Sequence, residues 1–337
     1  MHEATLYTAE EQGLRCNLCS HQCLIAPGRR GLCAVRENRD GILYSLVYGQ
    51  VAAEAVDPVE KKPLYHFLPG SHTWSIATRG CNFRCRHCQN YSLSQVGARE
   101  SPVGRQRSPA EVVAMARTAG CESISYTYSE PTIFFEFAED CGLLARQQGL
   151  KNIFVSNGYL SAVAAERAAT WLDAANIDIK AFSEKFYREI CGAKLAPVLE
   201  TVQHLHSLGV WLEITTLIIP GLNDSEAELR SLAEFIAGIS IDIPWHLSAF
   251  YPTYKLTDAP RTPPQTLLMA REIGQDAGLH YVYLGNVALT GAGDTSCPGC
   301  GKAVIKRDGR GGFQLERKNY AAGKCRGCGY ALAGCWS

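Results

Sequence analysis

The sequence lacks three features that would point to a particular compartment or partner: net charge, long apolar runs and a leader segment. Its 33 Lys and Arg residues balance 33 Asp and Glu residues, so the chain has no overall electrostatic bias toward nucleic acid or membranes. No stretch approaches the roughly twenty apolar residues that cross a bilayer. The start, MHEATLYTAEEQ, has neither the basic nor the apolar region of a signal peptide. We therefore expect a cytoplasmic protein with no membrane partner.

Cysteine, in contrast, is abundant, with 15 residues in 337. In a secreted protein this number would suggest disulfides. Most of these residues fall in C-x2-C or C-x3-C groups, which without an export signal indicate metal ligation. Outside the groups, Cys121, Cys141 and Cys191 are predicted to be small buried hydrophobic residues, and Cys335 is ambiguous.

The middle of the chain, residues 74–290, alternates apolar strands with amphipathic helical stretches. This alternation indicates an α/β fold with a parallel sheet covered by helices. An open sheet and a barrel both fit. A barrel is favoured because Asp178 and Lys180 share one face of a strand, and inward charges mark a site at the carboxyl end of a barrel. The predicted strands lie near residues 74–80, 122–129, 151–156, 175–181, 211–219, 244–250 and 280–285.

Residues 1–40 are predicted to form a Cys-rich metal-binding module, followed by a connector, residues 41–73, packed on the barrel. The module has too few apolar residues to fold alone, so we expect a closed metal site that packs on the barrel. Zinc and a second 4Fe-4S cluster both remain open for this site. Its predicted ligands are Cys16, Cys19, Cys23 and Cys33, with His21 and His66 as spare ligands.

Residues 291–337 form a Gly-rich tail with two C-x2-C pairs separated by 24 residues. Each pair is followed by Gly, which lets the backbone turn around a metal, so a zinc ribbon is favoured over an iron-sulfur site. A net charge of +6 would suit RNA, the less favoured partner, or an acidic protein. The alternative is a lid that stabilises the barrel end. The ligands are Cys297, Cys300, Cys325 and Cys328; the basic residues are Lys302, Lys306, Arg307, Arg310, Arg317, Lys318, Lys324 and Arg326, against Asp308 and Glu316.

The most specific pattern is Cys81-x3-Cys85-x2-Cys88 within GCNFRCRHCQN, with an aromatic residue, His87, before the last Cys. Three thiolates select zinc or an iron-sulfur cluster and leave one metal position free for chemistry. The spacing resembles the signature of the radical S-adenosylmethionine (radical SAM) superfamily. That resemblance implies a partial (β/α)6 barrel whose three catalytic Cys hold a 4Fe-4S cluster, with SAM on the fourth iron. A zinc site and three unrelated thiols are the alternatives.

The resemblance also implies the chemistry and a set of SAM contacts. An electron from the cluster cleaves SAM to methionine and a 5′-deoxyadenosyl radical, which abstracts hydrogen from an unidentified small-molecule or protein substrate. Successive strands end in the candidate contacts. Tyr128-Ser129 stands where the superfamily has Gly-Gly, so close backbone approach is in doubt there. The cofactor-binding candidates are Ser129, Glu130, Asn157, Gly158, Asp178, Lys180 and His246. On later strands, Glu213, Thr215 and His246 face inward by the same alternation, and they could equally line the substrate side or be polar residues of the barrel wall.

Over nearly its whole length, including CNLCSHQC, YTYSEPT and IDIKAFSEKFY, the chain resembles radical SAM enzymes of the AmmeMemoRadiSam system, a pyruvate formate-lyase activating enzyme-like group. This implies Memo-like and AMMECR-type partner proteins, besides an electron donor of the flavodoxin or ferredoxin type. Two alternatives are kept: an activating enzyme for a glycyl radical enzyme, and a metal-binding RNA or protein adaptor without catalysis.

Overall fold

The computed structural model describes residues 1–97, 100–308, 314–316 and 320–337, and its centre is an eight-stranded sheet. Seven strands run parallel, and β8 (Ala53–Pro58), from the predicted connector, pairs antiparallel at one edge. The seven predicted strands and the partial α/β barrel are confirmed. The parallel strands are β9 (His72–Ala77), β11 (Ser123–Tyr126), β12 (Lys151–Ser156), β13 (Ala174–Asp178), β14 (Trp211–Ile218), β15 (Trp245–Ala249) and β16 (Val282–Gly285).

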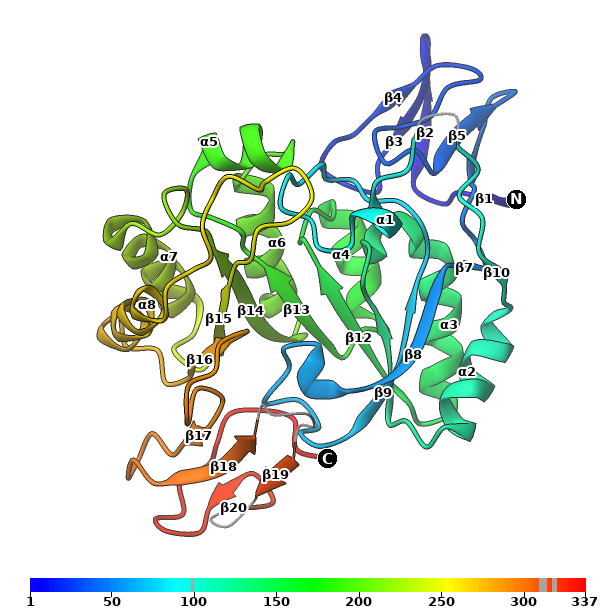
Figure 1. Cartoon of the computed structure of the whole chain (residues 1–337). Helices are drawn as coiled ribbons and strands as arrows, with labels where there is room; N and C mark the ends of the chain where they lie inside the picture. Colours follow the sequence, from blue (N-terminus) through cyan, green and yellow to red (C-terminus); the bar gives the residue numbers. More distant parts are fainter. Residues whose placement is uncertain (98–99, 309–313, 317–319) are drawn as a thin grey trace.

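Helices cover the outer face of the sheet (Figure 1). Their starts are encoded locally: Ser108 and Glu111 form a capping box at α2, with Pro109 in its first turn. Trp171 and Phe154 pack edge to face between sheet and helices, which makes a close-packed core there. No helix in the described part of the chain is both long and apolar enough to span a membrane. The covering helices are α2 (Pro109–Thr118), α3 (Phe135–Gln147), α4 (Ala162–Ala169), α6 (Ala196–Ser207), α7 (Glu226–Ile239) and α8 (Pro264–Asp276).

The N-terminal module lies beside the carboxyl ends of the first parallel strands (Figure 1). It consists of short antiparallel strands, since a segment this small satisfies its backbone groups by hairpin pairing. A buried ion pair from Arg36 Nη2 to Glu136 Oε2 (2.5 Å) attaches it to α3. Its strands are β1 (His2–Glu3), β2 (Tyr7–Glu10), β3 (Gly13–Cys16), β4 (Leu24–Ile25), β5 (Arg36–Arg39) and β6 (Ile42–Ser45); β7 (Gln50–Val51) and β10 (Arg105–Gln106) pair nearby.

The C-terminal tail lies at the opposite end of the barrel, where the parallel strands begin (Figure 1). The connector joins the two: the backbone N–H groups of Tyr65 and His66 donate to the Glu213 carboxylate near the start of β14. On the other side, His66 Nδ1 contacts the Ala333 carbonyl and Arg307 donates to the Tyr65 carbonyl. The elements here are η1 (Val59–Lys61), β17 (Thr295–Ser296), β18 (Ala303–Asp308), β19 (Gln314–Glu316), β20 (Tyr320–Ala321) and β21 (Lys324–Cys325).

Candidate functional site

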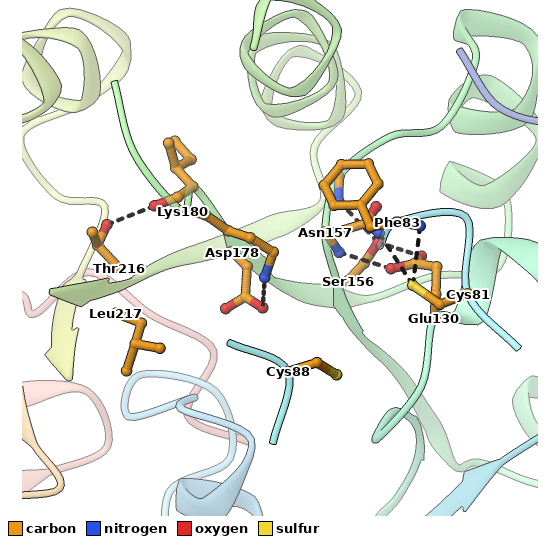
Figure 2. Close-up of polar contacts among 12 residues, drawn as sticks. Cys81, Phe83, Cys88, Glu130, Ser156, Asn157, Asp178, Lys180, Thr216 and Leu217 are labelled. Carbon is orange, nitrogen blue, oxygen red and sulfur yellow. Dashed lines mark hydrogen bonds and ion pairs between the residues drawn. The ribbon is translucent and has the colours of Figure 1, made fainter. Parts of the chain in front are cut away.

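The three Cys of the C-x3-C-x2-C motif lie on the loop that follows β9 at the carboxyl end of the sheet; Figure 2 shows Cys81 and Cys88. Each sulfur has a nearby donor group. The Phe83 N–H donates to Cys81 Sγ (3.3 Å), Cys88 Sγ contacts Ser94 Oγ (3.1 Å), and the thiol of Cys191 lies against Cys85. Donors of this kind stabilise thiolates, which are the form that binds metal.

The loop folds sharply because Gly80 begins it with φ of 109°. A Cβ at this position would lie 2.7 Å from Val35 Cγ1 and 3.2 Å from the Cys33 carbonyl oxygen. Only glycine permits this backbone conformation together with this close approach. The residue before Cys81 is therefore also a point where the N-terminal module touches the motif.

Glu130 joins the ends of β11 and β12. Its carboxylate accepts hydrogen bonds from the Thr132 N–H (3.0 Å) and hydroxyl (2.6 Å), from Ser156 Oγ (2.8 Å) and from the Asn157 N–H (2.9 Å). Burial raises the pKa of Glu130, although these donors oppose the shift. Glu130 also caps η2 (Pro131–Phe134). It therefore holds two strand ends in register beside the motif loop.

Tyr128 adopts a left-handed backbone conformation, with φ of 62°, where the superfamily signature has glycine. Such a φ is strained for a bulky residue and is found mainly where structure around it enforces it. Here the Tyr128 hydroxyl donates to Asp57 and its ring lies 4.4 Å from Lys62 Nζ. The side chain thus points to the connector, while the backbone at residue 128 keeps a glycine-like conformation.

Asn157 contacts the motif loop directly. Its Nδ2 donates to Asn82 Oδ1 (2.7 Å), next to Cys81, while its Oδ1 accepts from the Tyr159 N–H (3.1 Å). Gly158 follows with φ of 68°, and a Cβ there would lie 2.7 Å from Ile177 Cγ2. The Asn-Gly turn is therefore fixed by packing and also supports the segment carrying Cys81.

Asp178 and Lys180 are joined by an ion pair, with 2.8 Å between Lys180 Nζ and Asp178 Oδ2 (Figure 2). Burial disfavours charge on Lys180, but the Asp178 carboxylate and the thiols of Cys85 and Cys191 raise its pKa overall. The Lys180 N–H donates to the Tyr187 hydroxyl (3.0 Å). A fixed positive charge therefore lies next to the Cys triplet.

Several buried polar atoms around the triplet have no hydrogen-bond partner within the described residues. They are Thr78 Oγ1, Asn82 Nδ2, His87 Nδ1 and Ser129 Oγ. Burial lowers the pKa of His87 to about 3, so its ring is neutral at pH 7. Because buried polar groups normally have partners, this set offers hydrogen-bonding groups that a polar ligand would satisfy. Three donor-supported sulfurs, a lysine and these atoms fit a thiolate-bound cluster with a polar co-ligand such as SAM.

His246 does not join this group. Its Nε2 bonds Glu213 Oε2 (2.6 Å), and its ring packs against Tyr65 at 4.7 Å between centroids. Glu213 in turn binds the connector backbone at the amino end of the sheet. The inward orientation predicted for Glu213 and His246 is met, but both serve the junction with the connector. Thr215 Oγ1 is buried without a partner among the described residues.

The four Cys of the N-terminal module line one cavity between the module and the barrel. His21 also lines it, and its Nε2 contacts the Asn82 carbonyl at 2.8 Å. His66, the other spare ligand of the sequence hypothesis, lies instead at the amino end of the barrel with both ring nitrogens hydrogen-bonded. The sequence hypothesis placed His66 near the N-terminal Cys residues because it follows them closely in the chain. The connector that carries His66, however, runs past the whole barrel. The cavity Cys are Cys16, Cys19, Cys23 and Cys33.

The four Cys of the tail converge, with all sulfurs within 4.8 Å of one another. Cys297 and Cys328 are 3.6 Å apart, and Cys300 and Cys325 are 3.7 Å apart. Burial acts to raise the pKa of Cys325. Backbone N–H donors, of which Gly327 contributes most, and the neighbouring thiols outweigh this effect and lower the pKa to about 7. This is a four-Cys group ready to bind a metal ion. The tail residues Arg310, Arg317 and Lys318 lie outside the described residues.

Comparison with known proteins agrees with this geometry. Residues 75–234 match the family described as the radical SAM superfamily. Over 309 residues the chain is 44% identical to the uncharacterized protein MJ0808 of Methanocaldococcus jannaschii, a match that covers 91% of this chain and 92% of that protein. The chain belongs to the radical SAM superfamily. Membership in this superfamily implies a 4Fe-4S cluster and SAM as cofactors.

Two further similarities are to a second protein of the same archaeon and to a solved structure. Over 227 residues the enzyme is 21% identical to MJ1632 of the same archaeon, named as a candidate glycyl-radical enzyme activating enzyme; the match covers 64% of this chain and 80% of that one. The solved structure of Streptococcus suis SuiB bound to precursor peptide SuiA aligns with a TM-score of 0.50 and 13% identity, over 68% of this chain and 51% of that one. The second likeness concerns the fold alone.

One residue of this radical SAM site escaped the sequence prediction. Cys191, interpreted as a small buried hydrophobic residue, is buried but lies against Cys85 at the end of η3 (Tyr187–Cys191), a π-helical turn. Such turns are frequent at functional sites. The C-x2-C and C-x3-C spacing rules do not detect it because 102 residues separate it from Cys88.

Proposed function

We propose that this enzyme cleaves SAM reductively and uses the resulting 5′-deoxyadenosyl radical to abstract hydrogen from a substrate at the carboxyl end of the barrel. When bound, the cluster supplies the electron that breaks the sulfonium bond of SAM. The observation that carries the proposal is the set of unpartnered buried polar atoms around the Cys triplet. A protein that had lost its chemistry would have no reason to keep such atoms unsatisfied, which argues against an adaptor without catalysis.

In this proposal the protein's own residues bind and orient SAM. Lys180 carries a fixed positive charge that suits the SAM carboxylate. The backbone of residues 128–130, which begins with the glycine-like conformation of Tyr128, and Ser129 Oγ are available for polar groups of the methionine part. The ring centroids of His87 and Phe186 are 5.9 Å apart. The neutral His87 ring offers an apolar face and an Nδ1 that has no hydrogen-bond partner among the described residues. Glu130 and Asn157 hold the ends of β11 and β12 against the Cys81 loop through the hydrogen bonds described above.

The position of the tail bears on the expectation from the sequence that the basic tail suits a macromolecular partner. The tail covers the amino end of the barrel, and Arg307, one of its basic residues, is buried against the connector. A partner that docks on the tail would not reach the Cys triplet. We therefore propose that the substrate enters from the carboxyl end, and that any Memo-like or AMMECR-type partner of the AmmeMemoRadiSam system approaches there too.

We also propose that the tail binds zinc in a structural role. Four thiolates with sulfur separations of 3.6 and 3.7 Å suit the tetrahedral geometry of a closed zinc site. The group packs against its own small hydrophobic cluster, which includes Val304 and Ile305. A metal there would hold together a segment that has little core of its own.

Activation of a glycyl radical enzyme is the second candidate. Its support is the similarity to MJ1632, which covers 80% of that protein. This candidate would make the substrate a glycine in a protein loop, and its product a stable radical on that partner.

The test is anaerobic reconstitution with iron and sulfide, reduction, and detection of 5′-deoxyadenosine and methionine after addition of SAM. We expect both products from the intact enzyme and none from Cys85→Ala, which removes a cluster ligand. Cys121→Ala, a buried thiol away from the triplet, is the matched control. Product formation by the Cys85 variant at the intact rate would overturn the proposal. A glycine-centred radical signal on a partner protein would select the second candidate.

A further inference from the structure

The N-terminal cavity differs from the tail site in one decisive respect. Among the described residues, the tail Cys are the one group of His, Cys, Asp or Glu gathered closely enough for a single metal ion. The module's four thiols line a common cavity but are more widely spread. The Cys81, Cys85 and Cys88 triplet, a cluster site in this superfamily, shares that wider spread. A single zinc ion draws four sulfurs into contact, whereas a cubane keeps each sulfur on a different iron.

A second observation points to what fills this cavity. Arg36 lines it and is only 1% exposed. One nitrogen, Nη2, pairs with Glu136, but Nε and Nη1 are buried without any hydrogen-bond partner among the described residues. Leaving two guanidinium N–H groups unsatisfied in a buried site is costly. Thiolate and sulfide sulfurs of a bound cluster would supply the missing acceptors and the missing negative charge.

The cavity also adjoins the catalytic triplet. Asn82, the neighbour of Cys81, forms part of its wall, and His21 bonds the Asn82 carbonyl. On the other side of Cys81, Gly80 lies against the Cys33 carbonyl so closely that a Cβ would be 3.2 Å from it. The backbone of residues 80–82 thus spans the distance between one Cys of the module and one Cys of the triplet.

We propose that Cys16, Cys19, Cys23 and Cys33 bind a second 4Fe-4S cluster that passes electrons to the cluster of the triplet through residues 80–82. One electron enters from a low-potential donor protein of the flavodoxin or ferredoxin class and leaves to the second centre, with no bond broken and no proton moved. Leu32, 58% exposed beside the cavity, gives such a donor an apolar contact point. The relay rests on the proposed function, whereas the cluster site does not.

The cluster itself is tested in a variant without the catalytic site. The variant Cys81→Ala/Cys85→Ala/Cys88→Ala is purified anaerobically, reconstituted and analysed for metals and by EPR after reduction. We expect about four iron atoms per chain and a reduced 4Fe-4S signal, against about eight in the intact enzyme. Additional Cys19→Ala/Cys23→Ala changes should abolish both. The control pair is Cys121→Ala/Cys141→Ala, which changes two buried thiols that belong neither to the module nor to the triplet. Absence of iron from the triple variant would overturn the proposal, whether its zinc content is one ion, bound by the tail, or two, with the second bound by the module.

The relay is tested by comparing two reductants. In Cys19→Ala/Cys23→Ala, the ratio of 5′-deoxyadenosine formed with reduced flavodoxin to that formed with dithionite should fall about tenfold, because the small reductant can reach the triplet cluster directly. An unchanged ratio would overturn the relay. If the intact enzyme cleaves no SAM with either reductant, the proposed function fails, and the iron content of the triple variant still decides the second cluster.

Discussion

The thiol of Cys191 lies against that of Cys85, although 105 residues separate them in the sequence. This contact and the Lys180 charge lower the pKa of Cys85, while burial acts in the opposite sense. The π-helical turn that ends at Cys191 also receives the Arg84 N–H on its last carbonyl. The catalytic loop is therefore attached to this turn by both side chain and backbone.

Removing this thiol should change the redox behaviour of the cluster. Hydrogen bonds to ligand sulfur raise cluster potentials, so Cys191→Ala should lower the potential of the triplet cluster by about 20–60 mV, the equivalent of one modest hydrogen bond. An EPR-monitored redox titration measures it, with Cys141→Ala as the buried-thiol control. An unaltered potential would show that the contact has no electronic role.

Lys180 and His246 should behave differently, although both face inward. Lys180→Ala should raise the KM for SAM about tenfold, because it removes a charge-assisted contact to the carboxylate. His246→Gln should lower the unfolding midpoint and leave the KM for SAM within about twofold, since its partner is Glu213 at the connector. Steady-state 5′-deoxyadenosine formation and urea unfolding provide the two readouts. The exposed Lys185→Ala is the control. A large KM effect from His246→Gln would contradict this assignment.

The buried pair of Arg36 and Glu136 should make module attachment sensitive to acid. Burial opposes ionisation of Glu136, but the Arg36 guanidinium lowers its pKa overall. The stabilisation is therefore present above the ordinary glutamate pKa of about 4.3 and is lost as the pH falls through the lower folded-state value. Urea midpoints measured from neutral pH downward should show this loss, and the double variant Arg36→Met/Glu136→Leu should not show it.

At neutral pH, Arg36→Ala alone should cost about 3–5 kcal/mol of unfolding free energy, because it leaves a buried carboxylate unpaired. The double variant should cost less. Equal costs for the single and the double variant would mean that the pair contributes by packing alone.

The tail site should be structural. Cys325→Ser/Cys328→Ser should lose about one zinc per chain, since two of the four ligands of a closed tetrahedral site are gone. The thermal midpoint should fall, while cleavage of SAM should persist because the tail lies at the opposite end of the barrel from the triplet (Figure 1). Elemental analysis, calorimetry and product detection check the three expectations. Absence of zinc from the intact protein would contradict the metal assignment.

The sequence by itself determined those features that depend on residues close together in the chain. The spacing of Cys81, Cys85 and Cys88 predicts a cluster site, because a short loop brings its own ligands together. The two C-x2-C pairs of the tail do form one four-Cys group. The alternation of strand and helix predicts the parallel sheet, since each period reflects a local burial pattern.

Only the tertiary structure decided which distant groups meet. It placed the tail at the amino end of the barrel and the N-terminal module beside the catalytic loop, and it brought Cys191 to Cys85 and Arg36 to the second Cys cavity. It also moved His246 from the expected cofactor contacts to the connector. Side-chain periodicity tells which face of a strand a residue occupies, but not which partners it meets at either end of the barrel. Those partners follow from how the connector and the two metal modules pack on the barrel, through contacts between residues far apart in the chain.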